Sequence, residues 1–451
     1  MKQLVHKLQA SLQKRLATKL GRIWFVAAAG LPLLILSTFL VVFAVNVPFW
    51  DQWELVTLFQ KHHDGTLAFS DFFAQHNEHR LLFPRLVMYG LAVMSHWNTY
   101  WEVAASVILA AAGIFFLYKI VCKTIAHNLL RLLALFSISL IFFSPLQQEN
   151  WLWGWQIQWY LCILGLIVAV WALAAWESSP LKRVIVAALA AAVATYSLAS
   201  GFFVWIVCLP LLWFIRPLRR WLLLWLGLMI TAIGVHYIGY VDPAYHPSKT
   251  LFLDQPFQFV KYVVVYLAHP VTIDFAWSYK IAVLYFGGIS AVLIYMYRRY
   301  REQLVGSLLP WLCLGAYAVF AALSTGMSRL GFGVEQAFSS RYTTLAQFLL
   351  IAFVVVLCKM LEPSVTKKSA PFGWASKFAV AGFLVTMLFV GLNAGKGLVQ
   401  MQLKSDYLQQ ARQCAHTATS VDDPCLFKLY PNETVVWERL QYIRHIHWGG
   451  L

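Results

Sequence analysis

The fold class follows from residues 23–45, IWFVAAAGLPLLILSTFLVVFAV, which form an apolar run without a charged side chain. A helix of about 20 apolar residues crosses the hydrocarbon core of a bilayer and satisfies its own backbone hydrogen bonds there. Strands of a membrane β-barrel are short and alternate between apolar and polar residues, which this run does not. The run therefore predicts a transmembrane helix.

The composition of the whole chain agrees with a lipid environment. Of its 451 residues, 60% are hydrophobic and 12% are charged, whereas soluble domains average about 45–50% apolar and about 25% charged residues. This excludes a soluble globular enzyme and predicts an all-α polytopic membrane protein. The net charge of +16 would fit a nucleic-acid partner in a soluble protein, but in a membrane protein basic residues gather in cytoplasmic segments. We therefore expect membrane lipid, and no nucleic acid, as a partner.

About eleven membrane spans can be placed on the sequence by apolar length. The basic segment 1–22 carries leucines at helical spacing and predicts an amphipathic helix on the cytoplasmic surface, which directs the first span outward. A transmembrane domain then covers residues 23–398. Besides 23–45, its expected spans are 100–121, 131–146, 156–175, 184–199, 201–215, 221–240, 279–297, 306–323, 342–360 and 378–398.

The apolar stretch 81–94 decides the topology, because counting it as a span inverts every later segment. With this stretch at the outer interface, most lysines and arginines fall in cytoplasmic segments, as the positive-inside rule requires. We therefore expect an external loop at 46–98 that contains an interfacial helix, with Arg85 extended toward the interface. Whether 81–97 crosses the membrane completely is left open. This topology predicts a bacterial inner-membrane protein with its site on the periplasmic side.

Residues 399–451 form a polar tail on the same external side. The tail is too short for a core of its own and is expected to fold over the outer mouth of the bundle. Cys414 and Cys425 flank its Asp-Asp-Pro sequence and are disulfide candidates in an oxidising compartment. The other five cysteines lie inside or at the borders of apolar runs.

Two carboxylates follow the first span in the sequence FWDQWE at 49–54. A carboxylate next to tryptophan and the bilayer is partly desolvated, which makes it a better proton acceptor for a hydroxyl substrate. Asp51 and Glu54 are therefore catalytic candidates. The alternative is structural, because Asp favours helix N-caps and a Glu three residues later resembles a capping box.

A second polar segment, QHNEHR at 75–80, precedes the interfacial helix. His76, Glu78 and His79 have side chains that bind divalent transition ions, although their spacing is not a strong metal signature. The alternatives are contacts of Glu78, His79 and Arg80 with a phosphate or sugar, and a solvated loop. The sequence requires no cofactor, and a divalent metal is left open.

Four tryptophans among amides and one acid mark the segment QQENWLWGWQIQW at 147–159. Indole faces stack on the C–H surfaces of sugars, and amides bind sugar hydroxyls. The segment predicts a carbohydrate platform with Gln148, Glu149, Asn150 and Trp151 as substrate-binding candidates. An aromatic belt at the membrane interface is the alternative, which explains the tryptophans but not the polar residues between them.

Two further segments, SRLGFG at 328–333 and SSRYTT at 339–344, flank another expected outer boundary. Glycine allows close approach of backbone to a ligand, and an arginine at a helix start binds phosphate together with free N–H groups. Arg329, Arg341 and Tyr342 are therefore candidates for contact with a lipid phosphate. The alternative is an arginine that reaches the lipid headgroups without a catalytic role.

The order of these features resembles the GT-C superfamily of membrane glycosyltransferases, which use polyprenyl-phosphate-linked sugars. In that family one span is followed by an acidic first external loop, interfacial helices and an inward span, with a second polar loop after the third span. Asp51 with Glu54, the stretch 81–94, the span 100–121 and Glu149 occupy these places, over residues 1–240.

The resemblance implies that a sugar passes from a polyprenyl phosphate to an envelope glycan, lipid or protein acceptor on the outer face by an inverting displacement. The residues carried over are Asp51 as base, Arg80, Arg329 and Arg341 for the leaving phosphate, and Glu54, Glu78 and Glu149 to orient hydroxyls. Two alternatives stay open. A polymerase or ligase of lipid-linked polysaccharide uses the same lipid-phosphate chemistry, and a lipid or sugar flippase would place ionisable residues near the membrane midplane.

Overall fold

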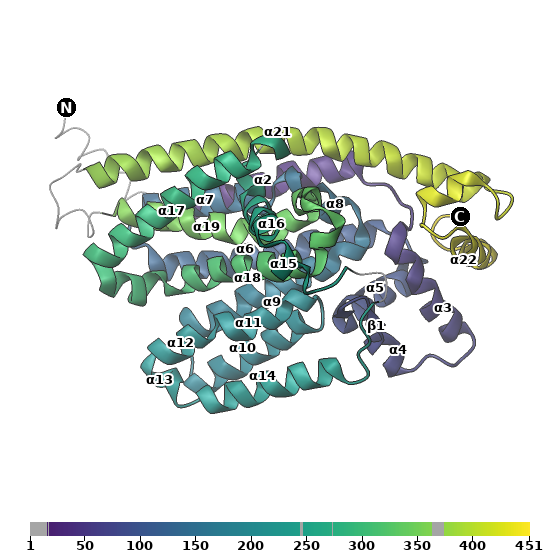
Figure 1. The fold of residues 1–451 in the computed structure, drawn as a ribbon, viewed down its shortest axis with the longest axis horizontal. Coiled ribbons are helices and arrows are strands. Elements are labelled where there is room, and N and C mark those ends of the chain that lie inside the picture. The colour runs from purple at the N-terminus through teal and green to yellow at the C-terminus, as the bar shows by residue number, and fades with distance from the viewer. Residues whose placement is uncertain (1–15, 17, 244–246, 273, 363–373) are drawn as a thin grey trace.

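The computed structural model describes residues 16, 18–243, 247–272, 274–362 and 374–451 (Figure 1). These residues are almost entirely helical, and the strands among them are two short ones that form a hairpin. The all-α prediction is therefore confirmed. Most of the amphipathic helix expected at 1–22 lies outside the described residues.

Eight segments of the described chain are helical, long and apolar enough to cross a membrane. The chain is therefore an integral membrane protein. The helices in these segments are α2 (Lys19–Phe43), α6 (Tyr100–Thr124), α7 (Asn128–Phe142), α9 (Ile157–Ala174), α17 (Phe275–Gln303), α18 (Leu309–Arg329), α19 (Thr343–Met360) and α21 (Trp374–Thr417). They run mostly along the long axis of the molecule (Figure 1).

Three of the expected spans correspond to shorter helices, and α13 (Arg216–Arg219) connects the second of them to the third. These helices are α10 (Pro180–Thr195), α11 (Phe202–Val207) with α12 (Leu209–Phe214), and α14 (Leu222–Tyr237). Sixteen residues of α-helix measure about 24 Å, less than the roughly 30 Å of the hydrocarbon core. By length and composition the described residues therefore support eight spans, fewer than the eleven expected.

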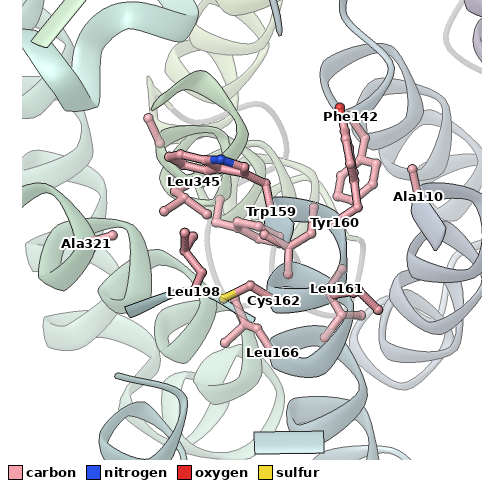
Figure 2. Close-up of a cluster of buried hydrophobic side chains, with 14 of the residues drawn as sticks. Ala110, Phe142, Trp159, Tyr160, Leu161, Cys162, Leu166, Leu198, Ala321 and Leu345 are labelled. Carbon is pink, nitrogen blue, oxygen red and sulfur yellow. The ribbon is translucent and has the colours of Figure 1, made fainter. Parts of the chain in front are cut away.

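The buried centre of the bundle is formed by α9 and α19. In the segment that contains α19, 94% of the most apolar window is buried, against 22% for the segments of α17 and α21. Figure 2 shows side chains of α9, among them Tyr160 and Leu161, between Leu345 of α19 and Ala110 of α6. Helices α17 and α21 therefore present apolar surface outward, as lipid-facing helices do.

Residues 46–98 fold into a unit at one end of the bundle, together with the C-terminal tail (Figure 1). Its elements are η1 (Trp50–Leu55), α3 (Val56–His63), α4 (Phe69–Phe73), β1 (Gln75–His76), β2 (His79–Arg80) and α5 (Leu82–Ser95). The two strands pair antiparallel, with His76 opposite His79. Arg85 of α5 is buried and donates to the carbonyls of Phe72 and Ala74. It ties α5 to the end of α4, so the expected extension of Arg85 toward the interface is wrong.

Short elements connect the long helices, and several of them contact one another at the same end of the molecule. They are η2 (Pro145–Gln147), α8 (Gln148–Leu152), η3 (Gly154–Gln156), η4 (Ala199–Gly201), α15 (Leu251–Asp254), α16 (Pro256–Ala268), η5 (His269–Val271), η7 (Leu330–Phe332), η8 (Val334–Phe338) and η9 (Ser340–Tyr342). Helix η6 (Leu304–Leu308) joins α17 to α18. Contacts of α8 and η2 with η9 bring the segments 147–159 and 339–344 together.

The last long helix, α21, has 44 residues, which corresponds to about 66 Å and so extends well beyond a bilayer core. The expected boundary between residues 398 and 399 therefore falls inside one helix. Beyond it lie η10 (Pro424–Lys428) and α22 (Glu433–His445), and a disulfide joins Cys414 to Cys425. Two backbone hydrogen bonds connect the tail to residues 46–98. The Trp50 N–H donates to the Leu429 carbonyl and the Gly449 N–H donates to the His96 carbonyl, both at 2.8 Å.

Candidate functional site

Asp51, Glu54 and His76 form an acid–imidazole group. His76 Nδ1 lies 2.9 Å from Glu54 Oε2, and His76 Nε2 lies 3.7 Å from Asp51 Oδ2. The His76 side chain is buried, whereas the Asp51 and Glu54 side chains are 29% and 28% exposed. The structure thus joins both catalytic candidates to a histidine that the sequence did not pair with them.

The backbone positions these three side chains from two directions. Asp51 and Glu54 lie three residues apart in η1, which is one turn of 3-10 helix and places both on the same side. His76 comes from β1, and its ring centroid lies 5.1 Å from that of Trp155. The hairpin therefore aims the imidazole at the carboxylates from across the loop.

Gln52 takes the capping role that the sequence assigned to the two acids. The Phe49 N–H donates to Gln52 Oε1 at 3.1 Å, and Gln52 Nε2 donates to Glu102 Oε2 at 2.5 Å. Trp97 Nε1 donates to the other oxygen of Glu102 at 3.2 Å. A Cβ at Gly154 would collide with the Glu102 carboxylate, so glycine is required there for close approach. Sequence analysis missed this buried support of η1 because Glu102 stands alone among apolar residues.

The charges of the acid–imidazole group follow from its contacts. Burial alone would lower the pKa of His76, but the hydrogen bond to Glu54 and the negative charges of Glu54 and Asp51 outweigh it and raise the pKa to about 9. Burial acts to raise the pKa of Glu54, but the hydrogen bond and charge of His76, with Arg85 and Arg439, hold it below its ordinary value. At neutral pH, a cationic His76 is therefore bound to an anionic Glu54. Asp51, beyond hydrogen-bond distance of His76, is the more available proton acceptor.

The same group has the donor set of a metal site. One ligand atom from each of Asp51, Glu54 and His76 lies within 4.8 Å of the others, and carboxylate and imidazole ligands suit divalent transition ions. A metal would have to displace the proton of His76, so its binding would weaken as the pH falls. The metal set expected from the sequence differs, because Glu78 and His79 have other partners.

Glu78 and His79 serve the packing of the hairpin against two distant helices. Glu78 Oε1 accepts from Arg329 Nη2 at 2.6 Å, with both side chains largely buried. His79 Nδ1 accepts from the Ala199 N–H at 3.0 Å. Burial lowers the pKa of His79 to about 4, so its ring is neutral near pH 7. His76, Glu78 and His79 therefore do not form one metal site.

Arg80 is buried and bonded to backbone. Its guanidinium donates to the carbonyls of His236, Ile238 and Phe73. These bonds join β2 to the end of α14, and they direct three of the five guanidinium N–H donors to backbone carbonyls. The expected role of Arg80 as a phosphate ligand is therefore not supported.

Glu149 lies in the first turn of α8, and its carboxylate contacts the start of η9. Its Oε2 accepts from Ser339 Oγ at 2.9 Å, Ser340 Oγ at 3.0 Å and the Arg341 N–H at 3.1 Å. A carboxylate at a helix N-terminus is stabilised by the helix dipole. Three donors on one oxygen fix Glu149 as a support for the 339–341 turn.

Two cations approach Glu149 without forming an ion pair with it. The charges of Arg341 and Lys404 both act on Glu149, yet neither has a carboxylate within ion-pair distance in the described part of the chain. Lys404 Nζ lies 3.7 Å from the centre of the Phe49 ring. Two cations beside one fully bonded carboxylate leave net positive charge, which suits an anionic ligand.

The other candidates in the segments 147–159 and 339–344 pack around the turn that Glu149 supports. Gln148 Nε2 donates to Ser340 Oγ at 3.1 Å, and Asn150 Nδ2 donates to the Arg341 carbonyl at 2.9 Å. Tyr342 is buried, and its ring stacks on that of Tyr266 at 4.9 Å. The segments 147–159 and 339–344, which the sequence analysis treated separately, are thus joined by side-chain hydrogen bonds of the two amides.

Trp151 is fully buried, and its indole N–H donates to the Ser144 carbonyl at 3.0 Å. Its ring stacks on Tyr160 with centroids 4.6 Å apart. Trp153, Trp155 and Trp159 are also buried. The prediction of a sugar platform on these indoles is therefore wrong, because all four rings are buried inside the bundle.

Lys404 is the main site residue that sequence analysis missed. It was assigned to a tail of unknown fold, whereas α21 carries it as a continuous helix to the level of Phe49 and Tyr407. The signal available in the sequence was the lysine itself, since Lys404 follows the apolar part of α21 by only a few residues.

Comparison with known proteins gives no further identification: no family model, no curated protein and no solved structure matches this chain.

Proposed function

We propose that this protein is a membrane glycosyltransferase that transfers a sugar from a polyprenyl-phosphate-linked donor to an envelope glycan, lipid or protein acceptor. The observation that carries the proposal is the pairing of an available carboxylate, Asp51, with two cations, Arg341 and Lys404, at one end of the bundle. The two parts meet at Phe49, whose ring contacts Lys404 and Trp153 and whose chain continues to Asp51.

Asp51 acts as the general base. The acceptor hydroxyl gives its proton to Asp51 as its oxygen attacks the anomeric carbon, and the bond from that carbon to the phosphate oxygen breaks with inversion. His76, bound to Glu54, holds positive charge 3.7 Å from Asp51. This charge offsets the repulsion between the two carboxylates of Asp51 and Glu54.

Arg341 and Lys404 bind the phosphate of the donor and of the polyprenyl phosphate that leaves. Negative charge grows on the bridging oxygen as its bond to the sugar breaks, and fixed cations stabilise that charge without an acid. Glu149 holds the turn that presents Arg341, through the Arg341 N–H. Glu149 is therefore a positioning residue in this scheme.

The sidedness of the site follows from the basic residues. The positive-inside rule assigns the end that carries Asp51 and Arg341 to the outer, periplasmic face of a bacterial inner membrane, with the N-terminus in the cytoplasm. This assignment includes α10, α11 with α12, and α14 as short spans beside the eight long ones. A polyprenyl phosphate in the outer leaflet would present its headgroup at this depth.

The distribution of charge favours a transferase over a transporter. No Asp, Glu, Lys or Arg occurs at 104–118, 132–148, 184–215 or 345–358, whereas transporters place ionisable groups near the midplane of broken helices. The ionisable groups of the site lie instead at one end of the bundle.

The proposal is tested by transfer of radiolabelled sugar in proteoliposomes. The purified chain would receive a panel of polyprenyl phosphates, each with a different labelled sugar, and envelope extract as the acceptor source, with and without a chelator. Label should appear in the acceptor with wild-type protein and with Asp64→Asn, an exposed acid of the same loop, but not with Asp51→Asn. Transfer of whole glycan blocks would identify a polymerase or ligase, and movement of the lipid without transfer would identify a flippase.

A further inference from the structure

Trp50 combines a backbone conformation and a side-chain exposure that the fold does not require. Its φ angle is +49°, in the left-handed region that glycine and asparagine adopt and bulky residues avoid. Its side chain is nevertheless 38% exposed, so burial in the core does not account for tryptophan at this position. A strained position that holds a large, exposed aromatic residue points to a use of the side chain itself.

The indole lies between the two parts of the proposed site. It contacts Trp153 edge to face, with centroids 6.4 Å apart, and Phe49 at 5.9 Å. Asp51, the next residue in η1, reaches His76, which packs on Trp155. Trp50 and Asp51 are therefore adjacent in η1, with the Trp50 indole against Phe49 and Trp153 and the Asp51 carboxylate near His76.

The C-terminal tail holds this conformation. The Trp50 N–H donates to the Leu429 carbonyl at 2.8 Å, and Leu429 is fully buried just after η10, which the Cys414–Cys425 disulfide fastens to α21. A hydrogen bond to a fixed carbonyl defines the direction of the Trp50 backbone. The indole is thus presented by a rigid support, which lowers the entropy cost of ligand binding.

We propose that Trp50 is a stacking platform for a pyranose ring of the substrate, beside the carboxylate of Asp51. A pyranose has an apolar C–H face that packs on an indole and hydroxyls at its rim that bond to carboxylates, and Trp50 and Asp51 offer these two surfaces side by side. The inference deepens the proposed transferase function and rests on it for the source of the ring, which is either the donor sugar or a sugar of the acceptor. A role of Trp50 as a lipid-interface anchor is the competing outcome.

Binding is measured first, because it does not depend on transfer. Saturation-transfer NMR on the detergent-solubilised chain would use methyl glycosides of glucose, galactose, mannose and N-acetylglucosamine as probes. With wild type, at least one probe should receive saturation mainly on the protons of one ring face. Trp50→Ala should weaken this binding about tenfold, the loss of one aromatic contact of about 1.4 kcal/mol, while Trp50→Phe should retain most of it.

Two further variants separate sugar contact from folding and from membrane anchoring. Trp50→Gly relieves the left-handed φ, so loss of binding in this variant with an unchanged melting midpoint assigns the effect to the missing indole. Trp101→Ala removes a 56% exposed tryptophan of α6 near the same end and should bind as wild type. Equal binding by wild type, Trp50→Ala and Trp50→Gly would overturn the inference.

Kinetics then identify the source of the ring. With Trp50→Phe and Trp50→Ala, a KM increase for the polyprenyl-linked donor alone assigns the stacked ring to the donor, and an increase for the acceptor alone assigns it to the acceptor. If no transfer is found with any donor but glycoside binding still depends on Trp50, the proposed function fails while the sugar site stands. If transfer occurs and Trp50→Ala leaves both KM values unchanged, the sugar site fails while the proposed function stands.

Discussion

Both ends of the bundle carry acidic side chains in contact with basic ones, but the two ends differ in how these side chains are buried and hydrogen-bonded. At one end, Glu362 is almost completely buried, and its carboxylate accepts from the N–H groups of Ala126 and His127 and from Lys359 Nζ. Lys359 also donates to the Thr124 carbonyl at 2.8 Å. This pair closes the turn between α6 and α7 onto the end of α19.

At the other end, Asp51 and Glu54 share one histidine and keep more than a quarter of their side-chain surface exposed. Arg341 and Lys404 lie near Glu149 without an ion pair, and Trp50, the residue before Asp51, has a left-handed backbone. A buried pair with all its bonds made is a structural element, because any ligand would have to compete with those bonds. Partly exposed charged groups that still have free hydrogen-bonding capacity can bind a ligand and react with it. The same residue types therefore indicate a structural role at one end and a chemical role at the other.

We call the end that carries Asp51 and Glu54 the open end. The largest expected effect is on turnover at this end. Asp51→Asn keeps the shape of the side chain but cannot accept a proton, and general-base catalysis typically contributes 10²–10⁴-fold in rate. We expect transfer to fall by about that factor with an unchanged melting midpoint and unchanged binding of polyprenyl phosphate. Residual turnover above about a tenth of wild type would show that Asp51 is not the base, and Glu54 would be tested next.

We call the end that carries Lys359 and Glu362 the closed end. There the largest effect should be on stability. Glu362→Ala leaves Lys359 buried without its partner, and removal of one member of a buried pair costs about 3–5 kcal/mol. We expect a lower melting midpoint and yield, with the turnover of the surviving folded protein close to wild type. Glu177→Ala removes an exposed pair with Lys123 at the same end and should leave the midpoint unchanged. An equal change of the melting midpoint in Glu362→Ala and Glu177→Ala would contradict the structural role given to the buried pair.

The cations of the open end should act on donor affinity. In the proposed mechanism Arg341 and Lys404 contact phosphate in both the ground state and the transition state, so Arg341→Ala and Lys404→Ala should weaken binding and turnover together. We expect an affinity loss of about tenfold for polyprenyl phosphate in each variant, the value of one charge-assisted bond of about 1.4 kcal/mol. Polyprenol without phosphate should bind all variants equally, and Lys261→Ala, an exposed lysine of α16, should match wild type. A Lys404→Ala protein with normal phosphate affinity would remove Lys404 from the site.

Local apolar length and spacing were enough to predict the helical class and the eight long apolar segments. They were insufficient for α10, α12 and α14, because an apolar run of about 16 residues is long for a core helix and short for a span. Tryptophan in the segment 147–159 was ambiguous for another reason. An indole at a membrane interface and a buried indole that donates to a backbone carbonyl, as Trp151 does to Ser144, leave the same composition in the sequence.

The candidate site was predictable only in its local parts. Asp51, Glu54 and Arg341 were found because each lies in a polar cluster just beyond an apolar run. The pairing of His76 with these acids depends on a hairpin turn that reverses the chain, and the approach of Lys404 depends on how far α21 continues as a helix. Contacts between residues so distant in sequence are set by tertiary packing, which residue spacing does not encode.

The smallest expected effect, and the most specific one, is the pH dependence of the open end. The pKa of His76 is raised from 6.5 to about 9 in the folded protein, so its hydrogen bond to Glu54 and its attraction to the charge of Asp51 contribute stability below pH 6.5 that is lost as the pH rises through about 9. The depressed pKa of Glu54 has the opposite sign, and its contribution above pH 4.5 is lost as the pH falls through the folded value. The wild-type melting midpoint should therefore decline between pH 6.5 and 9.5.

His76→Gln should abolish most of that decline, because glutamine keeps a donor near Glu54 but does not titrate. Its midpoint should lie below that of wild type at pH 6 and converge with it at pH 9.5, and His63→Gln, an exposed histidine of α3, should retain the wild-type slope. A wild-type midpoint that stays flat across this range would mean that His76 is neutral. The negative charge of Glu54 would then not be balanced by His76. There would be no physical reason to treat Glu54 as paired with His76 and Asp51 as the carboxylate that accepts the proton.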